Sequence, residues 1–409
     1  MPILGSSSSG GSRPTTPTIG TVTADNASAS VPFTASSYVG KGTITYTATS
    51  NPGGFTGTGS SPITVSGLTN GTSYTFTVVG ATNYGISSEV SGASNSVTPA
   101  IPQAGYVAGG AKAGGSGRSS IITKLSFTSE TSSDLSSRLT RELNYPAAAA
   151  NSGTAGYITG GATSDGGNGS RIEKLTFSTE TNSDIGSFAG IRYYHTGFAN
   201  SGTAGYFSGG TDGQGNYLSS IKKLTFPGES LSTIGATLSH TNSGYSAGTA
   251  NSGTAGYISG GSSGSYSLNM SKIDKLTFSN ESISTLSYTY SPNRNGQTSF
   301  ANSGTAGYFA GGQYISFDTV VGVGDIYKVS FSNDSVSSLG ATLSVTNDSP
   351  GGFAKSGTAG YISGGYGRSS FTYLSTIQKL TFSNDSVSTL AASTNPRAWS
   401  QGFANSGAL

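Results

Sequence analysis

Cysteine is absent from this chain of 409 residues. Its absence excludes disulfide bonds, thiolate metal ligands and thiol nucleophiles, and it leaves the redox compartment open. Charged residues are scarce, at 9% of the chain, and the net charge of +2 includes no run of basic residues. Such a chain has little long-range attraction for phosphate backbones or anionic lipid. We therefore expect neither nucleic acid nor a membrane surface as a partner.

Long hydrophobic runs are also absent. The N-terminus, Met1 to Leu4 followed by glycine and serine, lacks the basic start and the apolar stretch of a secretion signal. No segment approaches the roughly 20 apolar residues that a membrane-spanning helix needs. We therefore expect a product that is made in the cytoplasm without a signal peptide and without membrane insertion.

Glycine, tyrosine and phenylalanine are abundant, with 63, 22 and 18 copies. Glycine together with serine and threonine is typical of many short strands joined by turns. The aromatic residues alternate with polar ones, as in Ser73 to Val78, and they supply the apolar surface that disordered Gly/Ser-rich chains lack. The composition therefore predicts a folded, all-β protein.

The first hundred residues divide into an arm and a domain. Residues 1–13 are rich in glycine and serine and form the N-terminal arm, whereas residues 14–100 contain the short alternating strands of a β-sandwich. The segment Leu68 to Tyr74 resembles the turn and tyrosine corner of fibronectin type III domains. The tryptophan usual in strand B of that family is absent, and Val31 and Phe33 occupy its neighbourhood. We expect this domain to be a spacer or a docking domain.

Residues 101–409 repeat one pattern six times. Gly-Tyr-x-x-Gly-Gly occurs at Tyr106, Tyr157, Tyr206, Tyr257, Tyr308 and Tyr361. Successive tyrosines are 51, 49, 51, 51 and 53 residues apart, a period typical of four-stranded propeller blades. The double glycine, and an arginine that opens the next unit in several copies, resemble kelch repeats. The resemblance implies a six-bladed β-propeller, although the tryptophan expected near the fourth strand of a kelch repeat is missing.

The two ends of this repeat region predict how the propeller closes. The first unit begins at Gln103 without the Phe-Ala-Asn-Ser-Gly segment that precedes the later copies, and the chain ends on that segment, Phe403 to Gly407. We expect the C-terminal strand, from about Gly402 to Asn405, to pair with the strand from about Gly105 to Ala108 and to complete the first blade.

A lysine and a carboxylate also recur in every unit, three residues before and three residues after the phenylalanine of the third strand. The lysines are Lys124, Lys174, Lys223, Lys275, Lys328 and Lys379, and the carboxylates are Glu130, Glu180, Glu229, Glu281, Asp334 and Asp385. An active site needs an asymmetric cluster, whereas a residue present in every blade serves every blade equally. We interpret these residues as a structural ladder.

The sequence lacks the side chains of the catalytic sites known in propellers. Copper oxidases of the kelch type need two histidines, a tyrosine and a cysteine-linked tyrosine, but here cysteine is absent and the two histidines, His195 and His240, lie one blade apart. The sialidase Asp box has one degenerate match at residues 182–188, which we interpret as a turn. Folding could still bring two carboxylates together as in a glycosidase, although most acidic residues belong to the ladder or are isolated in the sequence. We expect no enzyme, no cofactor and no metal.

The loops on one rim of the predicted propeller differ between units. Those from the second to the third strand, and from the fourth strand to the next unit, vary in length and content, whereas the other turns hardly vary. Binding residues concentrate in such loops on rigid scaffolds. Aromatic rings beside arginine suit the faces and hydroxyls of sugars, and equally a protein hot spot. The candidate ligand-binding residues are Arg192, Tyr193, Tyr194, Tyr217, Tyr266, Arg294, Tyr314, Tyr366, Arg397 and Trp399; Tyr145, His195, Tyr290, Phe317 and Tyr373 lie in the same loops.

The Gly/Ser arm, the fibronectin-like domain with few charges, the near-identical repeats and the absence of cysteine together resemble bacteriophage virion proteins. The resemblance implies a tail fibre or receptor-binding appendage, present in many copies in a symmetric virion assembly. The arm and the fibronectin-like domain would contact other virion proteins, and the propeller face would bind a host surface glycan or protein. A capsid decoration or head fibre protein, and a secreted bacterial carbohydrate-binding adhesin, are the alternatives.

Overall fold

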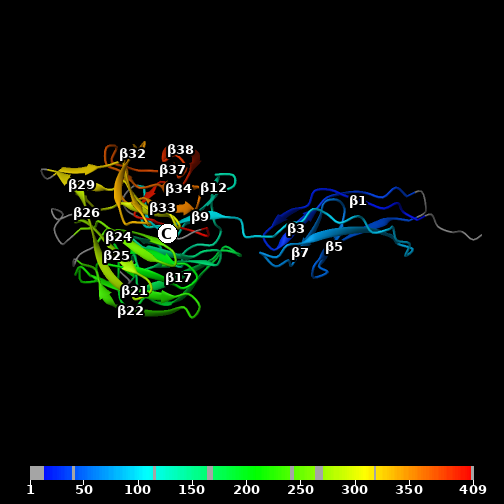
Figure 1. Ribbon diagram of the computed structural model, residues 1–409, viewed down its shortest axis with the longest axis horizontal. Helices are drawn as coiled ribbons and strands as arrows, with labels where there is room; N and C mark the ends of the chain where they lie inside the picture. The colour runs from blue at the N-terminus through cyan, green and yellow to red at the C-terminus, as the bar shows by residue number, and fades with distance from the viewer. Residues whose placement is uncertain are drawn as a thin grey trace, which may run out of the picture. The chain divides into compact units, whose positions relative to one another are not determined.

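The computed structural model describes residues 13–38, 42–113, 117–163, 169–239, 244–262, 270–316 and 319–406. Their regular secondary structure consists of β-strands alone (Figure 1), so the predicted all-β class is confirmed. Within these ranges no helix is long and apolar enough to span a membrane. The chain divides into two compact units, Met1–Pro102 and Gln103–Leu409. Of the predicted N-terminal arm, residues 1–12 lie outside the described residues.

The first unit is built from small antiparallel sheets around one apolar core. In one sheet β3 (Ser28–Val31) lies between β2 (Thr23–Asp25) and β7 (Ile63–Ser66), and in another β5 (Ile44–Asn51) lies between β6 (Thr56–Gly59) and β8 (Thr75–Thr82). A short pair joins β1 (Thr18–Ile19) to β4 (Phe33–Thr34). Alternate side chains of β8, such as Phe76 and Val78, point into the core because strand side chains have a period of two. The hydroxyl of Tyr74 accepts a hydrogen bond from the Thr69 N–H at 3.0 Å and closes the turn before β8.

The second unit contains six four-stranded antiparallel sheets, numbered here 1 to 6 in chain order. Sheet 1 combines β9 (Ala104–Ala108), β11 (Ile122–Ser126) and β12 (Ser132–Asp134) with the C-terminal β40 (Gln401–Ala404). Sheet 2 consists of β14 (Ala147–Asn151), β15 (Ala155–Thr159), β17 (Arg171–Thr176) and β18 (Thr181–Ser187). Sheet 3 consists of β19 (Thr196–Asn200), β20 (Ala204–Ser208), β21 (Ser220–Thr225) and β22 (Ser230–Thr237).

The remaining three sheets have the same strand order. Sheet 4 consists of β23 (Ala247–Asn251), β24 (Ala255–Ser259), β25 (Met270–Thr277) and β26 (Ser282–Arg294). Sheet 5 consists of β27 (Thr298–Asn302), β28 (Ala306–Ala310), β31 (Asp325–Ser330) and β32 (Val336–Thr342). Sheet 6 consists of β33 (Gly351–Lys355), β34 (Ala359–Ser363), β37 (Thr376–Thr381) and β38 (Ser386–Ser393).

The loops between these strands contain further short two-stranded pairs. The pairs are β10 (Ala111–Lys112) with β39 (Arg397–Ala398), β13 (Leu143–Asn144) with β16 (Ala162–Thr163), β29 (Gln313–Ser316) with β30 (Thr319–Gly322), and β35 (Tyr366–Gly367) with β36 (Thr372–Tyr373). They lie in the loops whose sequences vary between units.

The C-terminal strand completes sheet 1, as the ends of the repeat region predict. In β40, Gly402 pairs with Val107 and Phe403 pairs with Tyr106 of β9. The first strands of neighbouring sheets also contact one another in an unbroken cycle, in the order β40, β14, β19, β23, β27, β33 and back to β40. The predicted pairing of the C-terminal strand is confirmed.

The glycine of each Gly-Tyr motif is required by packing between neighbouring sheets. A Cβ atom at Gly156 would lie 2.2 Å from the ring of Phe403, and one at Gly256 would lie 2.1 Å from the ring of Phe198. Both glycines belong to second strands, and both phenylalanines belong to the first strand of the preceding sheet. Any larger residue would therefore push adjacent sheets apart.

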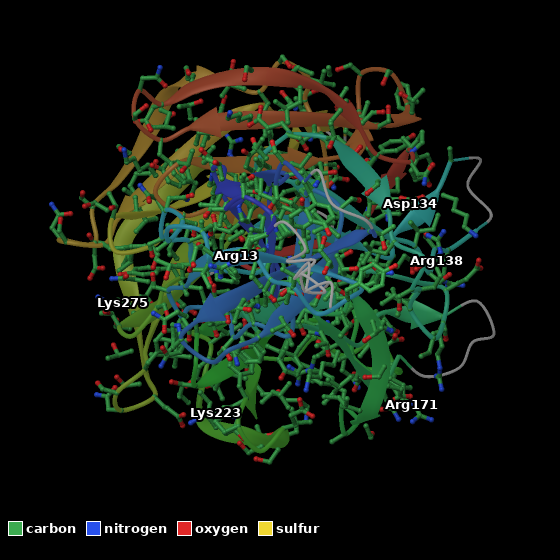
Figure 2. The ribbon with its side chains drawn as sticks, turned by 90° about the vertical axis from the view of Figure 1, so that its right-hand side faces the viewer. Arg13, Asp134, Arg138, Arg171, Lys223 and Lys275 are labelled. Atoms are coloured by element: carbon green, nitrogen blue, oxygen red, sulfur yellow. The ribbon has the colours of Figure 1, made fainter. Side chains whose placement is uncertain are left out.

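Ion pairs link each sheet to the next through the recurring lysines and carboxylates. Each lysine of a third strand pairs with the carboxylate in the following sheet, and Lys379 of sheet 6 returns to Glu130 of sheet 1 at 2.5 Å. The other pairs are Lys124 with Glu180, Lys174 with Glu229, Lys223 with Glu281, Lys275 with Asp334 and Lys328 with Asp385. Figure 2 shows Lys223 and Lys275 toward the outer edge of the second unit. The predicted ladder is present and runs through all six sheets.

Candidate functional site

The candidate site starts from a ring of six residues, each of which lies two positions before the first strand of a sheet. All six have left-handed backbone conformations: Tyr145 (φ 57°), Tyr194 (60°), Tyr245 (63°), Gly296 (65°), Ser349 (52°) and Trp399 (57°). Such angles are uncommon for bulky residues. Backbone N–H groups hold the ring together, since Tyr245 donates to Tyr194 at 2.9 Å and Trp399 donates to Ser349 at 2.9 Å. The bonds from Tyr145 to Trp399, Gly296 to Tyr245 and Ser349 to Gly296 continue it.

Four members of this six-residue ring are aromatic, and their side chains pack on one another. The ring centroids of Tyr194 and Tyr245 lie 4.3 Å apart in a stacked arrangement, and Tyr145 meets Tyr194 edge-on at 4.2 Å. Trp399 lies 5.1 Å from Tyr145. Burial raises the pKa of the Tyr145 hydroxyl, and the neighbouring Tyr194 and Asp348 raise it further. The four half-buried side chains therefore form a rigid, uncharged aromatic cluster.

Two hollows adjoin the aromatic cluster. The larger, of about 270 Å³, is lined by the four aromatic residues together with Tyr217, Ser262, Asn295, Gln313, Asp348 and Arg368. The smaller, of about 60 Å³, is lined by the same four and by residues that lead into the first strands, among them His195, Gln297 and Ser400. The cluster thus lies between a hollow bordered by the loops and a much smaller one bordered by the strands.

Several buried polar atoms in the lining residues have no hydrogen-bond partner among the described residues. They are Gln313 Oε1 and Arg368 Nε in the larger hollow, and His195 Nδ1, Gln297 Nε2 and Ser400 Oγ in the smaller one. Burial lowers the pKa of His195 well below its ordinary value, so its imidazole is neutral. A buried polar atom without a partner costs about 1–3 kcal/mol. Water or a ligand in the hollows would remove that cost.

One ion pair, with a buried carboxylate and a half-buried guanidinium, lies in the wall of the larger hollow. Asp348 is 2% exposed and accepts hydrogen bonds from Arg368 at 2.5 Å and from the Ser349 hydroxyl at 2.8 Å. Burial raises the pKa of Asp348, while Arg368 and Ser349 oppose that rise. The guanidinium of Arg368 also lies 5.0 Å above the ring of Tyr366. Arg368 therefore joins the hollow to the aromatic residues outside it.

An open groove of about 690 Å³ begins at Trp399 and Arg368. Its other lining residues are Ala113, Tyr366, Phe371, Thr372, Tyr373 and Pro396. Phe371 is 76% exposed and has a positive φ of 52°. Exposed aromatic residues that border a concave surface are typical of binding sites.

The structure gathers part of the predicted ligand-binding set. Trp399, Tyr194 and Tyr217 line the larger hollow, Tyr366 lines the groove, and Tyr193 packs edge-on against Tyr194 at 5.2 Å. Tyr314 lies in β29, within a hairpin, and lines neither the hollows nor the groove. Tyr266, Phe317 and His240 fall outside the described residues.

The three predicted arginines are buried rather than presented to a ligand, which corrects the prediction that they are donors on the surface. Arg397 is 2% exposed and donates to the Gly109 and Ile121 carbonyls and to Thr123 Oγ1. Arg192 donates to Ser220 at 2.7 and 3.0 Å, and Arg294 pairs with Asp325 at 2.6 Å. Each arginine thus precedes the first strand of a sheet and clamps that sheet by bonding to residues of its second or third strand or of the loop between them. Arg397 clamps sheet 1, Arg192 clamps sheet 3 and Arg294 clamps sheet 5. Their guanidinium groups have internal partners, so we leave them out of the site.

Tyr245, Gln313, Asp348 and Arg368 were missed by the sequence reasoning. For Tyr245 a signal existed, because Tyr145, Tyr194 and Tyr245 each lie twelve residues before the tyrosine of the following Gly-Tyr motif. Aligning the units on that motif would have placed all three at one position. No comparable signal existed for Asp348 and Arg368, since their pairing depends on the conformation of a loop whose length and sequence vary between the units.

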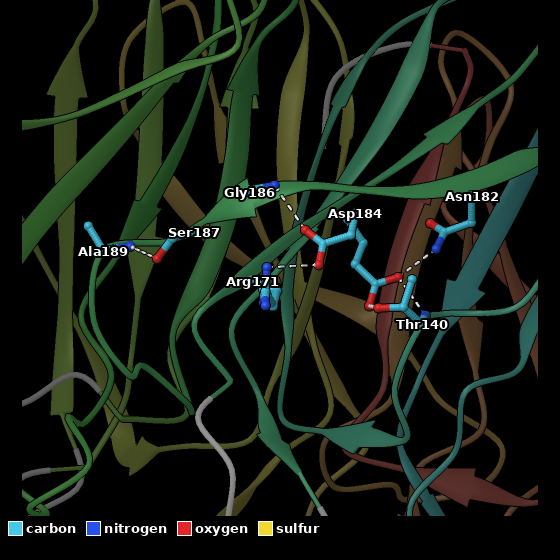
Figure 3. Close-up of polar contacts among 8 residues, drawn as sticks. Thr140, Arg171, Asn182, Asp184, Gly186, Ser187 and Ala189 are labelled. Atoms are coloured by element: carbon cyan, nitrogen blue, oxygen red, sulfur yellow. Dashed lines mark hydrogen bonds and ion pairs between the residues drawn. The ribbon is translucent and has the colours of Figure 1, made fainter.

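Carboxylates outside the ladder also have partners within the fold. Asp184 in β18 pairs with Arg171 at 3.2 Å and accepts from the Gly186 N–H, and Glu173 in β17 accepts from Thr140 and Asn182 (Figure 3). Burial raises the pKa of Glu173, while the hydrogen bonds from Thr140 and Asn182 lower it. Asp274 of sheet 4 and Gln378 of sheet 6 accept from Ser239 and Ser344 in the same way. Within the described part of the chain, no group of three or more histidine, cysteine, aspartate or glutamate residues is placed to hold a metal ion.

No protein-family model matches this chain, and no curated protein matches it.

Proposed function

We propose that this chain is a non-enzymatic virion protein of a bacteriophage, a tail fibre or receptor-binding appendage that binds a host surface glycan beside its six-residue ring. The observation that carries the proposal is the larger hollow. Aromatic faces surround it, its wall contains a buried polar atom without a partner, and its one acid is already paired with its one base.

The fold that we propose for the second unit is a six-bladed kelch-type β-propeller, each sheet being a blade. It is supported by the six four-stranded sheets, the cycle of contacts between their first strands and the ladder that returns from sheet 6 to sheet 1. For the first unit we propose a fibronectin type III-like domain, supported by its two three-stranded sheets and by the Tyr74 hydrogen bond that closes the turn.

The chemistry of the larger hollow suits a sugar. The apolar faces of a pyranose ring pack on aromatic rings, and its hydroxyl groups both donate and accept hydrogen bonds. Trp399, Tyr194 and Tyr245 supply the rings, while Asn295 and Gln313 supply amide groups. Each aromatic contact of this kind contributes about 1 kcal/mol. A single copy therefore binds weakly, and many copies on one particle supply the avidity that attachment requires.

The virion assignment rests on the composition of the whole chain. The first unit has few charges and no recognition motif of its own, which suits a domain that docks on other virion proteins in many copies. Location on the particle separates this proposal from its two alternatives, a capsid decoration or head fibre protein and a secreted bacterial adhesin.

Two experiments test the proposal. Cryo-EM of purified particles should locate the chain at the tail; density on the capsid lattice, or absence from particles, would overturn the assignment. Adsorption of particles to host cells should fall for Trp399→Asn, which keeps a residue that tolerates a positive φ. The matched control is Tyr314→Ala, a loop aromatic outside the hollows. Equal adsorption by wild type and Trp399→Asn would remove the hollow from attachment.

A further inference from the structure

We infer that the site takes the end of a neutral oligosaccharide, with its terminal ring in the larger hollow and the following rings along the groove over Trp399, Tyr373 and Phe371. This inference rests on the proposed function and deepens it. It assigns an orientation to the ligand and gives Phe371 a role that the ring residues do not share.

The hollow and the groove share part of their lining. Trp399 and Arg368 line both. Trp399 stacks with Tyr366 at 6.3 Å and meets Tyr373 edge-on at 5.8 Å, so one aromatic surface extends from the six-residue ring into the groove. A ligand that leaves the hollow past Trp399 stays in contact with aromatic rings.

The sizes of the hollows indicate that a chain ends here. The larger hollow, of about 270 Å³, is just below the range of about 300–1,000 Å³ typical of small-molecule sites, which suits a single sugar ring. Beyond the aromatic cluster the smaller hollow measures only about 60 Å³, enough for a few water molecules and too small for a second ring. The chain can therefore continue only away from the cluster, and the groove of about 690 Å³ has room for it.

The charges of the hollow indicate a neutral terminal ring. Asp348 and Arg368 are the charged residues among those that line it, and they pair with each other at 2.5 Å. An acidic ring would have to compete with Asp348 for the guanidinium and would leave the buried Asp348 carboxylate without its ion-pair partner. Arg368 Nε and Gln313 Oε1 are buried without partners among the described residues, and they supply one donor and one acceptor for sugar hydroxyl groups.

Phe371 marks the outer end of the groove. Its side chain is 76% exposed, and its backbone has a positive φ of 52°, a conformation that a phenylalanine rarely adopts. Strained backbone of this kind is concentrated at functional sites. A second or third sugar ring would stack on Phe371, whereas a single ring bound in the hollow would not reach it.

The test compares short and long probes on three full-length proteins. The probes are the methyl pyranosides of glucose, galactose, mannose and N-acetylglucosamine and the matching homotrisaccharides, titrated by saturation-transfer NMR and calorimetry. We expect at least one trisaccharide to bind more tightly than its methyl pyranoside. Phe371→Asn, which tolerates the positive φ, should weaken that trisaccharide about three- to tenfold and leave the pyranoside unchanged. Trp399→Asn should weaken both probes.

The outcomes separate the two proposals. If no probe binds the wild-type protein, the glycan function fails and the inference fails with it. If sugars bind and Phe371→Asn weakens both probe lengths equally, or neither, the orientation along the groove is wrong while the glycan function stands. If a trisaccharide that ends in a uronic acid binds as tightly as its neutral counterpart, the terminal ring is not selected for neutrality.

Discussion

Replacement of Phe403 by alanine tests how much the C-terminal strand contributes to the stability of the second unit. Phe403 is fully buried in β40, stacks on Tyr106 of sheet 1 at 5.6 Å and faces Phe177 of sheet 2 at 6.3 Å. Truncation of a buried phenylalanine to alanine costs about 3–5 kcal/mol. The site is walled by two different sheets that cannot both move into the space, so we expect a loss within that range.

The assay is equilibrium unfolding in urea, followed by tryptophan fluorescence. The chain has one tryptophan, Trp399, so the signal reports on the second unit alone. Phe371→Asn is the control, because its side chain is exposed and its loss should change the free energy of unfolding by less than about 0.5 kcal/mol. A loss below about 1 kcal/mol for Phe403→Ala would refute the reasoning, since the strand would then contribute little to the stability of the sheets it joins.

Two further predictions concern polar groups. Burial alone would raise the pKa of Glu130, but hydrogen bonds from Lys379 and Tyr361 outweigh it and lower that pKa. The ionised carboxylate therefore stabilises the folded state above the ordinary glutamate pKa, and this stabilisation is lost as the pH falls through the lowered pKa. Urea midpoints measured from neutral to acidic pH should show this loss of stability in the wild type. At neutral pH, Glu130→Gln should lower the free energy of unfolding by at most about 1 kcal/mol. Its stability should also lack the part of the acid dependence that is due to Glu130. Arg397→Met should cost about 1–3 kcal/mol in the same urea assay, because it removes the donor to the buried Gly109 carbonyl and one of the two donors to the Ile121 carbonyl. The Arg397→Met variant should bind the sugar probes with the affinity of the wild type. Weaker binding would show that Arg397 belongs to the ligand-binding site.

The parts of the structure that repeat were predictable from the sequence. The pairing of β40 with β9 followed from a segment missing at one end of the repeat region and present at the other. The ladder followed from Lys124 and its counterparts, which occupy one position in every unit. Repetition makes such features visible because one geometry imposes the same requirement on each copy.

The arginines show where sequence reasoning was misled. Arginine is rarely buried without a partner, and a loop position favoured an exposed side chain. In the structure Arg397 donates to the carbonyl of Gly109, and to that of Ile121, which also accepts from the Gly109 N–H at 3.1 Å. Those acceptors are backbone atoms, which leave no trace in the residue types. The Asp348–Arg368 pair was hidden for a related reason, since it depends on how one loop folds back over 20 residues.

The arginine clamps have a consequence for how such a protein can change its size. Sheets 1, 3 and 5 are each clamped by an arginine, namely Arg397, Arg192 and Arg294. Sheets 2, 4 and 6 instead contain a side chain that accepts a hydrogen bond from the segment connecting the preceding sheet to its own. These acceptors are Glu173, Asp274 and Gln378. Two kinds of junction therefore alternate around the cycle. Inserting or deleting one sheet would bring two junctions of the same kind together, while a change by two sheets would preserve the alternation. The smallest interchangeable module of this architecture is thus a pair of sheets, about a hundred residues long by the spacing of the repeats.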